Sequence, residues 1–393
     1  MKKLSGSEII IECLKQEGVK YIFGYPGGAV LHIYDALFSS DEIKHVLVRH
    51  EQGATHAADG YARACGKPGV VLVTSGPGIT NCVTGLATAH MDSIPMIVIS
   101  GQVSRQYVGS DAFQEADATG ITRPVTKHNF LIDSRESIAE VFKKAFKIAT
   151  TGRPGPVLID IPKDLTDPKV KIKFEYPKSV KFRSYKPPKK ESSSKIEEAA
   201  KILCAAKKPM IYTGGGVILG NAHKHLHSLV KSLNYPITNT LMGLGGYPGT
   251  DKQFLGMLGM HGTYEANMAM HDCDVLLAVG ARFDDRVTGD TQKFCPSAKI
   301  IHIDVDPSSI SKIIKVDLSL IGETSAILRD LTKSVGKFTR KIDRKSLEKW
   351  WKKIEKWRKR KCLDYKKSKD IIKPQQVIAV SYTHLRAHET EAY

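Results

Sequence analysis

Short runs of apolar residues recur along this chain, each bounded by glycine or proline and each separated from the next by a stretch with helical spacing. Residues 70–73, 96–99 and 157–161 are the clearest of these runs. Continuous apolar runs of this length are typical of strands that are buried on both faces of a parallel sheet. Strands that alternate with helices predict a doubly wound α/β domain, and we expect one over residues 1–165.

A second alternation of the same kind follows over residues 195–336. We expect helices over 195–206, 221–234 and 323–335, and strands over 209–213, 236–240, 274–279 and 299–305. The segment 166–194 holds four prolines and a serine triplet, which predicts a linker between the two domains. In the first domain, Ser7 stands where it could cap the first helix.

The chain has 393 residues and a formal net charge of +18, which by itself suggests a polyanionic partner such as nucleic acid or a membrane surface. The excess lies in two segments, however. Residues 163–195 carry a net charge of +7 and residues 337–369 carry +12, while the remainder is nearly neutral. The distribution of charge therefore weakens the case for a nucleic-acid-binding protein.

The second basic segment contains a predicted amphipathic helix over residues 344–363. Its apolar positions, spaced by three or four residues, are Leu347, Trp350, Trp351, Ile354 and Trp357. Such a helix could bind a membrane surface or nucleic acid. It could also lay its aromatic stripe on its own protein and leave its lysines in water, which is the interpretation that we favour. We assign residues 337–379 to this helix and a connector.

Seven cysteines are scattered along the chain without the spacing of a zinc site, which indicates reduced thiols in a cytoplasmic protein. The N-terminal stretch lacks the apolar run of a signal peptide, and no run of about 18 apolar residues could span a bilayer. We therefore expect neither a membrane partner nor a metal site in this chain.

Four loops of the first domain are predicted to lie where strands end and helices begin, at residues 24–28, 49–54, 74–81 and 101–103. Open α/β sheets bind ligands at this edge. Glu51 opens a helix there, among small residues whose surroundings could be dry. Its carboxyl group could share a proton with a ligand nitrogen, or it could merely complement the helix dipole, and the residues alone leave both readings open.

The second domain holds weaker signals of a phosphate-bearing ligand. Residues 214–216 are three glycines between a predicted strand and a helix, as in a phosphate-binding loop, although the full GxGxxG pattern is absent. The string ARFDDR at 281–286 suits either a solvated loop or the phosphates of a dinucleotide. Asp304 ends a predicted strand, where an acid can bind a ribose hydroxyl.

Longer strings are more specific. GYPGGAVLHIYDAL, RHEQGATHAADGYARA, TSGPGITN, DAFQEAD, TGRPGPVLIDIPKD, LGMHGTYEAN, GARFDDRVTG and IHIDVDPSSI occur in this order. Together they resemble the large catalytic subunit of acetolactate (acetohydroxyacid) synthase over residues 4–379. The resemblance implies two doubly wound parallel-sheet α/β domains, which are the pyrimidine-binding domain and the FAD-binding central domain of a thiamine-diphosphate enzyme.

The resemblance implies thiamine diphosphate, Mg²⁺ and FAD as cofactors, with FAD taking no net redox part. It also implies an enzyme that decarboxylates pyruvate and condenses the remaining two-carbon unit with a second 2-keto acid, either pyruvate or 2-ketobutyrate. This is the first common step of branched-chain amino-acid biosynthesis. By position, Glu51 matches the glutamate that bonds the cofactor's aminopyrimidine ring, and Gln114 and Lys163 join it as candidate catalytic residues.

Further positions are carried over from the same resemblance. Those that match the thiamine diphosphate site are Pro26, Gly27, Gly28, Pro77 and Asn81. Those that match the substrate and inhibitor channel are Gly28, Ala29, Val103, Ser104, Phe113 and Asp285. Those that match the FAD site are Arg153, Gly214, Gly215, Gly216, Thr240, Leu241, Leu258, Gly259, Met260, His261, Gly280, Ala281, Arg282, Asp284, Arg286, Val287, Asp304, Val305, Gly322 and Glu323.

The sequence departs from the family pattern in two ways. Position 104 is Ser where family members commonly have Pro, which predicts reduced sensitivity to herbicides that bind in the channel. The third family domain, whose GDG motif holds the diphosphate through Mg²⁺, has no counterpart here, and residues 380–393 resemble a translated adapter rather than the family. We therefore expect this polypeptide alone to be inactive, with the Mg²⁺ site outside it.

The resemblance also implies a homodimer or tetramer, with a regulatory small subunit as a further partner. Three alternatives stay open. The first is a pyruvate oxidase or another carboligase with the same first domain. The second is a non-catalytic FAD-binding fragment. The third is a basic nucleic-acid-binding protein, whose salt-dependent DNA binding would disappear on deletion of residues 337–369.

Overall fold

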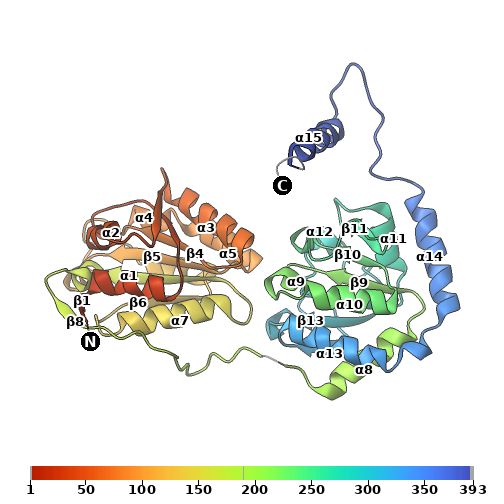
Figure 1. Cartoon of the computed structure of the whole chain (residues 1–393), viewed down its shortest axis with the longest axis horizontal. Helices are drawn as coiled ribbons and strands as arrows, with labels where there is room; N and C mark the ends of the chain where they lie inside the picture. The colour runs from red at the N-terminus through yellow and green to blue at the C-terminus, as the bar shows by residue number, and fades with distance from the viewer. Residues whose placement is uncertain (1, 189, 390–393) are drawn as a thin grey trace.

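A computed structural model describes residues 2–188 and 190–389, and it shows two α/β domains joined by an extended segment (Figure 1). The first domain contains a six-stranded sheet in the order β3-β2-β4-β5-β7-β6. Each neighbouring pair of these strands is parallel. The strands are β2 (Tyr21–Gly24), β3 (Lys44–Leu47), β4 (Gly69–Val73), β5 (Met96–Gln102), β6 (His128–Leu131) and β7 (Pro156–Pro162).

Helices cover both faces of this sheet, as the continuous apolar runs predict. Val70 and Leu72 of β4 pack in one core cluster, whereas Val71 and Val73 pack in another, because successive side chains of a strand point to opposite faces. The first cluster includes side chains of α1 (Gly6–Gln16), α2 (Leu31–Phe38) and α7 (Ile138–Thr150). The second includes side chains of α3 (Glu51–Cys65) and α5 (Val83–Asp92). The doubly wound prediction is confirmed.

Ser5, and not Ser7, is the N-cap of α1, so that expectation is wrong. Ser5 Oγ accepts a hydrogen bond from Glu8 N at 3.3 Å, and Glu8 Oε2 accepts one from Ser5 N at 2.7 Å. The pair forms a capping box, in which each side chain satisfies a backbone donor that the helix leaves free.

The start of the predicted linker belongs to the first domain. Residues 166–194 contain β8 (Lys171–Lys173), which pairs antiparallel with β1 (Lys3–Ser5). Lys173 lies opposite Lys3 in this register. Such a short two-stranded ribbon carries no long apolar pattern, so the sequence holds little sign of it.

The central domain repeats the architecture with a parallel sheet in the order β11-β10-β9-β12-β13-β14. Its strands are β9 (Pro209–Thr213), β10 (Ile237–Asn239), β11 (Phe254–Met257), β12 (Val275–Val279), β13 (Lys299–Asp304) and β14 (Leu318–Ile321). Its longer helices are α8 (Ser193–Ala205), α10 (His223–Leu233), α11 (Tyr264–Asp272) and α13 (Thr324–Gly336). The sequence does not predict β11 or β14, which lie at the two edges.

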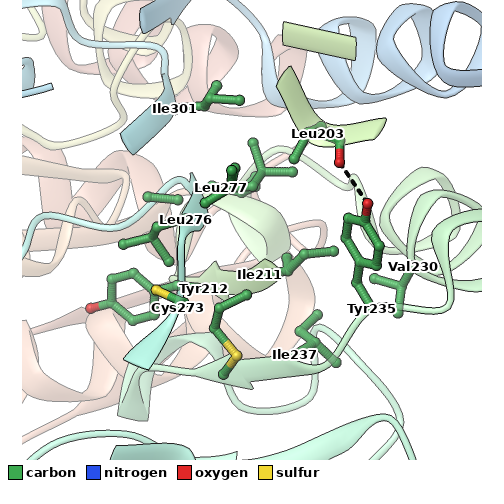
Figure 2. Close-up of a cluster of buried hydrophobic side chains, with 14 of the residues drawn as sticks. Leu203, Ile211, Tyr212, Val230, Tyr235, Ile237, Cys273, Leu276, Leu277 and Ile301 are labelled. Carbon is green, nitrogen blue, oxygen red and sulfur yellow. Dashed lines mark hydrogen bonds between the residues drawn. The ribbon is translucent and has the colours of Figure 1, made fainter. Parts of the chain in front are cut away.

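The core of the central domain is continuous across its sheet. Figure 2 shows Ile211, Leu276, Leu277 and Ile301 of three neighbouring strands among the side chains that pack around them. Tyr235 is fully buried there, and its hydroxyl donates a hydrogen bond to Leu203 O at 2.6 Å. The polar end of this tyrosine is thereby satisfied inside the core.

The basic helix packs against its own domain, as favoured above. It is α14 (Arg344–Arg358), in which Leu347, Trp350, Ile354 and Trp357 are buried in the core of the central domain. Trp350 Nε1 donates a hydrogen bond to Pro209 O at 3.0 Å, which anchors the helix to the start of β9. The aromatic stripe therefore stabilises the fold, and its lysines face outward.

Beyond α14, the last helix among the described residues is α15 (Pro374–Glu389), which spans residue 379, the last position of the family resemblance (Figure 1). Residues 390–393 of the predicted non-native tail lie outside the described residues. No helix within residues 2–188 and 190–389 combines the length and the apolar character that a bilayer crossing needs.

Candidate functional site

The four loops that the sequence singles out in the first domain follow β2, β3, β4 and β5. These four strands are parallel neighbours, so their carboxyl ends meet at one edge of the sheet. Gly101 and Gln102, expected in a loop, are instead the last residues of β5. The arrangement is the one in which open α/β sheets bind ligands.

Glu51 lies at this edge as the first residue of α3, after the N-cap His50. Only 9% of Glu51 is exposed. Asn81, which follows the short helix α4 (Pro77–Thr80), donates a hydrogen bond from Nδ2 to Glu51 Oε2 at 2.9 Å. Two predicted site residues that are thirty positions apart are thus in contact. The amide fixes the direction of a buried carboxyl group, which can share a proton with a ligand nitrogen.

The loop after β2 packs closely on the end of β4. A Cβ atom at Gly27 would lie 2.5 Å from the Cβ of Thr74, and Ala29 N donates a hydrogen bond to Thr74 Oγ1 at 3.3 Å. No atom lies within 4 Å of a Cβ built on Gly28, so there is open space beside that position. The glycines at 27 and 28 therefore serve different ends, one for backbone packing and one for access.

A further loop, which carries Phe113 and Gln114, packs at the same edge of the sheet. Gly76 has φ +56, and a Cβ there would lie 2.7 Å from Gln114 O. Gln114, with φ +57, is thereby packed on the turn that leads into Pro77 and α4. Phe113 beside it is 88% exposed. The backbone of Gln114, a predicted catalytic residue, thus packs on the turn that leads to Asn81, and Phe113, a predicted channel residue, is its neighbour in the chain.

Three other predicted residues lie at the ends of neighbouring strands. Val103 and Ser104 follow β5, and Lys163 begins the 3₁₀ turn Lys163–Thr166 directly after β7. Asp285 is separate from all of these, because it opens the short helix α12 (Asp285–Thr288) of the central domain. The first domain alone therefore supplies every predicted channel residue except Asp285.

In the central domain, each predicted FAD segment follows a different strand. Residues 214–216 follow β9, 240–241 follow β10, 258–261 follow β11, 280–287 follow β12, 304–305 end β13 or follow it, and 322–323 follow β14. Because all six strands are parallel, these segments gather at one edge of the sheet.

Glycine allows these loops to approach one another. A Cβ at Gly214 would lie 2.3 Å from Gly280 O, and a Cβ at Gly259, which has φ +97, would lie 2.6 Å from Arg286 O. Arg282 Nη2 lies 3.6 Å from Asp284 Oδ2 on the same loop, and both side chains are partly exposed. Backbone amides and guanidinium groups are thus available together at this edge, as a phosphate-bearing ligand requires.

Two buried titratable residues, His302 and Asp304, lie near this edge at the end of β13. Burial raises the pKa of Asp304 to about 6. Burial also lowers the pKa of His302 to about 4, and His302 Nε2 lies 3.0 Å from Ala281 O, to which it donates a hydrogen bond as a neutral ring. Within residues 2–188 and 190–389, no group of three or more His, Cys, Asp or Glu side chains could hold a metal ion.

Arg153 links the two domains. Its Nε donates a hydrogen bond to Ser93 Oγ at 2.7 Å, and its Nη1 lies 3.3 Å from Asp306 Oδ2 of the central domain. Together with Lys127 and Val305, it lines a cleft of about 510 Å³ between the domains. The predicted FAD residue of the first domain thus faces those that follow β13.

One polar residue near this edge, Asp160, is missed by the sequence reasoning. Asp160 is an acid inside the apolar run 157–161, and it is 1% exposed. A lone acid in a strand that is buried on both faces is the signal that could have revealed it, because such a group needs a polar partner.

Comparisons with known proteins agree with the geometry. A family model described as "Thiamine pyrophosphate enzyme, N-terminal TPP binding domain" matches residues 4–121, and one described as "Thiamine pyrophosphate enzyme, central domain" matches residues 196–331. The chain is 53% identical over 382 residues to the acetolactate synthase large subunit of Haemophilus influenzae, covering 97% of this chain and 66% of that protein.

Two further relatives show the same pattern. The acetolactate synthase isozyme 3 large subunit of Escherichia coli is 52% identical over 378 residues, covering 96% of this chain and 66% of that protein. The probable acetolactate synthase large subunit of Methanocaldococcus jannaschii is 52% identical over 329 residues, covering 84% of this chain and 56% of that protein. The chain thus spans about two thirds, or less, of the length of these relatives. It belongs to the thiamine pyrophosphate enzymes, with their N-terminal and central domains, and among them it is similar to acetolactate synthase large subunits.

Proposed function

We propose that this chain supplies the pyrimidine-binding and FAD-binding parts of an acetolactate synthase large subunit. The enzyme decarboxylates pyruvate and joins the remaining two-carbon unit to a second 2-keto acid, which gives 2-acetolactate or 2-aceto-2-hydroxybutyrate. The observation that carries the proposal is the buried Glu51 carboxyl group, held by Asn81 at 2.9 Å, at the ligand-binding edge of a chain with synthase relatives.

The residues at this edge fit thiamine diphosphate. When bound, this cofactor supplies a carbon nucleophile for the keto carbonyl and accepts the electron pair that departing CO₂ leaves behind. Glu51 would hold a proton at a nitrogen of the aminopyrimidine ring, and its burial keeps water from competing for that proton. Pro26, Gly27 and Pro77 would line the ring, and the open space beside Gly28 leaves room for it.

Three polar or aromatic side chains suit the substrate side of the same edge. The Lys163 ammonium follows β7 at the carboxyl edge, where a cation can orient the carboxylate of a 2-keto acid. Gln114 and Phe113 lie on the loop that packs on Gly76, next to the segment that carries Asn81. Ala29, Val103 and Ser104 complete the approach in the first domain.

The carboxyl edge of the central domain fits FAD. Close backbone packing at Gly214 and Gly280 leaves room for a dinucleotide to approach the main chain, and Arg282 and Arg286 supply cations for its diphosphate. Asp304 is the last residue of β13, a position at which an acid can bind a ribose hydroxyl. The described residues offer no cluster of side chains for Mg²⁺.

The proposal extends to partners. Pyruvate and 2-ketobutyrate are the proposed substrates. We further propose that the working enzyme is a homodimer or tetramer that associates with a regulatory small subunit, since the relatives are named as large subunits.

A chimera tests this function. It joins residues 1–379 of this chain to the last third of the Escherichia coli relative, and it is supplied with pyruvate, thiamine diphosphate, Mg²⁺ and FAD. We expect 2-acetolactate as the product. Acetate or acetyl phosphate instead would assign the chain to the oxidases of the same superfamily. The visible absorption of flavin in the purified 393-residue chain checks the FAD site independently, and a colourless chain that binds no added FAD would contradict that part.

A further inference from the structure

A buried polar network joins the middle of the first sheet to the rim segment, which we define as residues 103–117. Its members are Ser100 and Gln102 of β5 and Asp160 of β7, and they are 0%, 4% and 1% exposed. Ser100 and Asp160 are directly paired in the parallel register, and Gln102 lies two residues further along the same face. On this face Val98 and Leu158 belong to the apolar core, so the network begins where that core ends.

Every polar atom of the Gln102 amide has a partner. Nε2 donates one hydrogen bond to Asp160 Oδ2 at 3.0 Å and another to Ala116 O at 2.9 Å. Oε1 accepts a hydrogen bond from Val103 N at 2.9 Å. Gln102 therefore ties the buried carboxyl group to both ends of the rim segment. Ser100 Oγ donates to the other carboxyl oxygen, Asp160 Oδ1, at 2.5 Å, and does not touch the segment.

The rim segment needs such ties because its backbone is unusual. Asp111 and Gln114 have φ +57, a left-handed conformation that side-chain-bearing residues adopt at a cost. The Glu115 carboxylate accepts hydrogen bonds from Gly109 N and Ala112 N and so holds the turn together from within. The contact of Gln102 with Ala116 O then fixes that turn to the sheet, and Gln114 comes to rest on Gly76.

We infer that Asp160 and Gln102 are positioning residues that hold the rim segment over the loop of Gly76, and so place Gln114 and Phe113 beside the site of Glu51. The inference rests on the proposed function only for what Gln114 and Phe113 do there. Burial raises the pKa of Asp160 to about 7, and the hydrogen bonds from Ser100 and Gln102 act in the opposite direction. The Ser100 and Gln102 donors thus favour the ionised form of the Asp160 carboxyl group, which accepts both hydrogen bonds.

Amide hydrogen exchange of the full 393-residue chain, read by mass spectrometry, tests the placement without any cofactor. Asp160→Leu keeps the bulk of the side chain and offers no acceptor, so one hydrogen of the Gln102 NH₂ group loses its partner and Gln102 is no longer tied to β7. Gln102→Met removes all three bonds. We expect amides 109–118 to exchange about tenfold faster in both variants, which is the effect of losing roughly one net hydrogen bond.

Ser100→Ala is the matched control, because it removes the other hydrogen bond of the same carboxyl group. Exchange in 109–118 should stay within about twofold of the wild type in this variant, since the ties to the segment are untouched. Equal acceleration in Ser100→Ala and Asp160→Leu, or none in Gln102→Met, would overturn the inference. Gln102→Met keeps the carboxyl group in place, so it still decides the question if Asp160→Leu does not fold.

The link to the proposed reaction is measured in the chimera. Gln102→Met should raise the KM for pyruvate about tenfold more than it lowers kcat, because the rim segment orients substrate, whereas an exposed control, Glu136→Gln, should change neither. An unchanged KM would refute the effect on substrate. If the chimera forms no acetolactate at all, the proposed function fails, while the exchange result still decides the placement.

Discussion

Replacing Trp350 is the most direct way to ask what the basic helix α14 does. Trp350 is 2% exposed, and its indole Nε1 donates to Pro209 O at 3.0 Å. Its ring also meets Trp357 edge-on, with centroids 5.7 Å apart. Trp350→Ala removes the buried ring, the aromatic pair and the partner of a buried carbonyl. Large-to-small core changes of this kind lower the free energy of unfolding by about 3–5 kcal/mol.

Trp350→Phe divides this loss into parts. Phenylalanine keeps most of the buried ring and loses the donor to Pro209, so we expect a loss of about 1–2 kcal/mol. Lys352→Ala is the surface control on the same helix, where the side chain is exposed, and it should change stability by less than about 0.5 kcal/mol.

Urea unfolding of the full chain, followed by far-ultraviolet circular dichroism and by the fluorescence of the remaining tryptophans, gives these three values. All three tryptophans of the chain lie on α14, so the fluorescence reports on the central domain. Equal stability of Trp350→Ala and Lys352→Ala would refute the packing role of the stripe. Salt-dependent DNA binding that is lost in a Lys349, Lys352 and Lys356 triple alanine variant would support the nucleic-acid interpretation instead.

Three further predictions concern the first domain. Burial raises the pKa of Asp160 to about 7 from its ordinary value of 3.8. Between about pH 4 and pH 7 the native state therefore holds a proton that the unfolded chain releases. The stability that depends on this group is greatest at low pH and is lost as the pH rises from about 4 to 7. Urea midpoints at about pH 5 and about pH 8, compared with those of Asp160→Asn, should show this slope in the wild type only, and parallel profiles would contradict it. Asn81→Ala removes the donor to Glu51 and should lower acetolactate formation by the chimera about tenfold or more without changing its flavin content, whereas full activity would show that the contact is dispensable. Ser104 has φ −58, which suits proline, so Ser104→Pro should fold with a Tm within about 2 °C of the wild type and bind channel inhibitors more tightly; an inhibition curve that does not move would refute the role of this position.

Much of the fold can be predicted because buried parallel strands leave a simple pattern. The run at 70–73 is apolar at every position since each face of the sheet is covered by helices, and β4 lies there. The edge strands β6, β11 and β14 escape such reasoning, because they are short and partly exposed. The ribbon of β1 and β8 escapes it as well, since its stability comes from pairing across the chain and not from an apolar run.

The candidate site shows the same division. Glu51 can be found because a helix-opening acid after a strand stands out in the sequence. The resemblance assigns Asn81 to the same site, but the hydrogen bond between the two side chains is visible only in the structure. The network of Ser100, Gln102 and Asp160 depends on the register between β5 and β7, which no local pattern reveals. Side-chain pairs across a sheet therefore need the structure, whereas the edge at which ligands bind does not.

We propose that Glu51 holds a proton at the aminopyrimidine ring of the cofactor, and a comparison of two variants with the wild type tests this role. Acetolactate formation from pyruvate is measured in the chimera for the wild type, for Glu51→Gln and for the exposed control Glu136→Gln, at equal flavin content. We expect a loss of about 10²–10⁴-fold for Glu51→Gln and no loss for Glu136→Gln, because this is the range observed when a positioned proton-holding group is removed. Activity of Glu51→Gln within about threefold of the wild type, on the same scale, would contradict it.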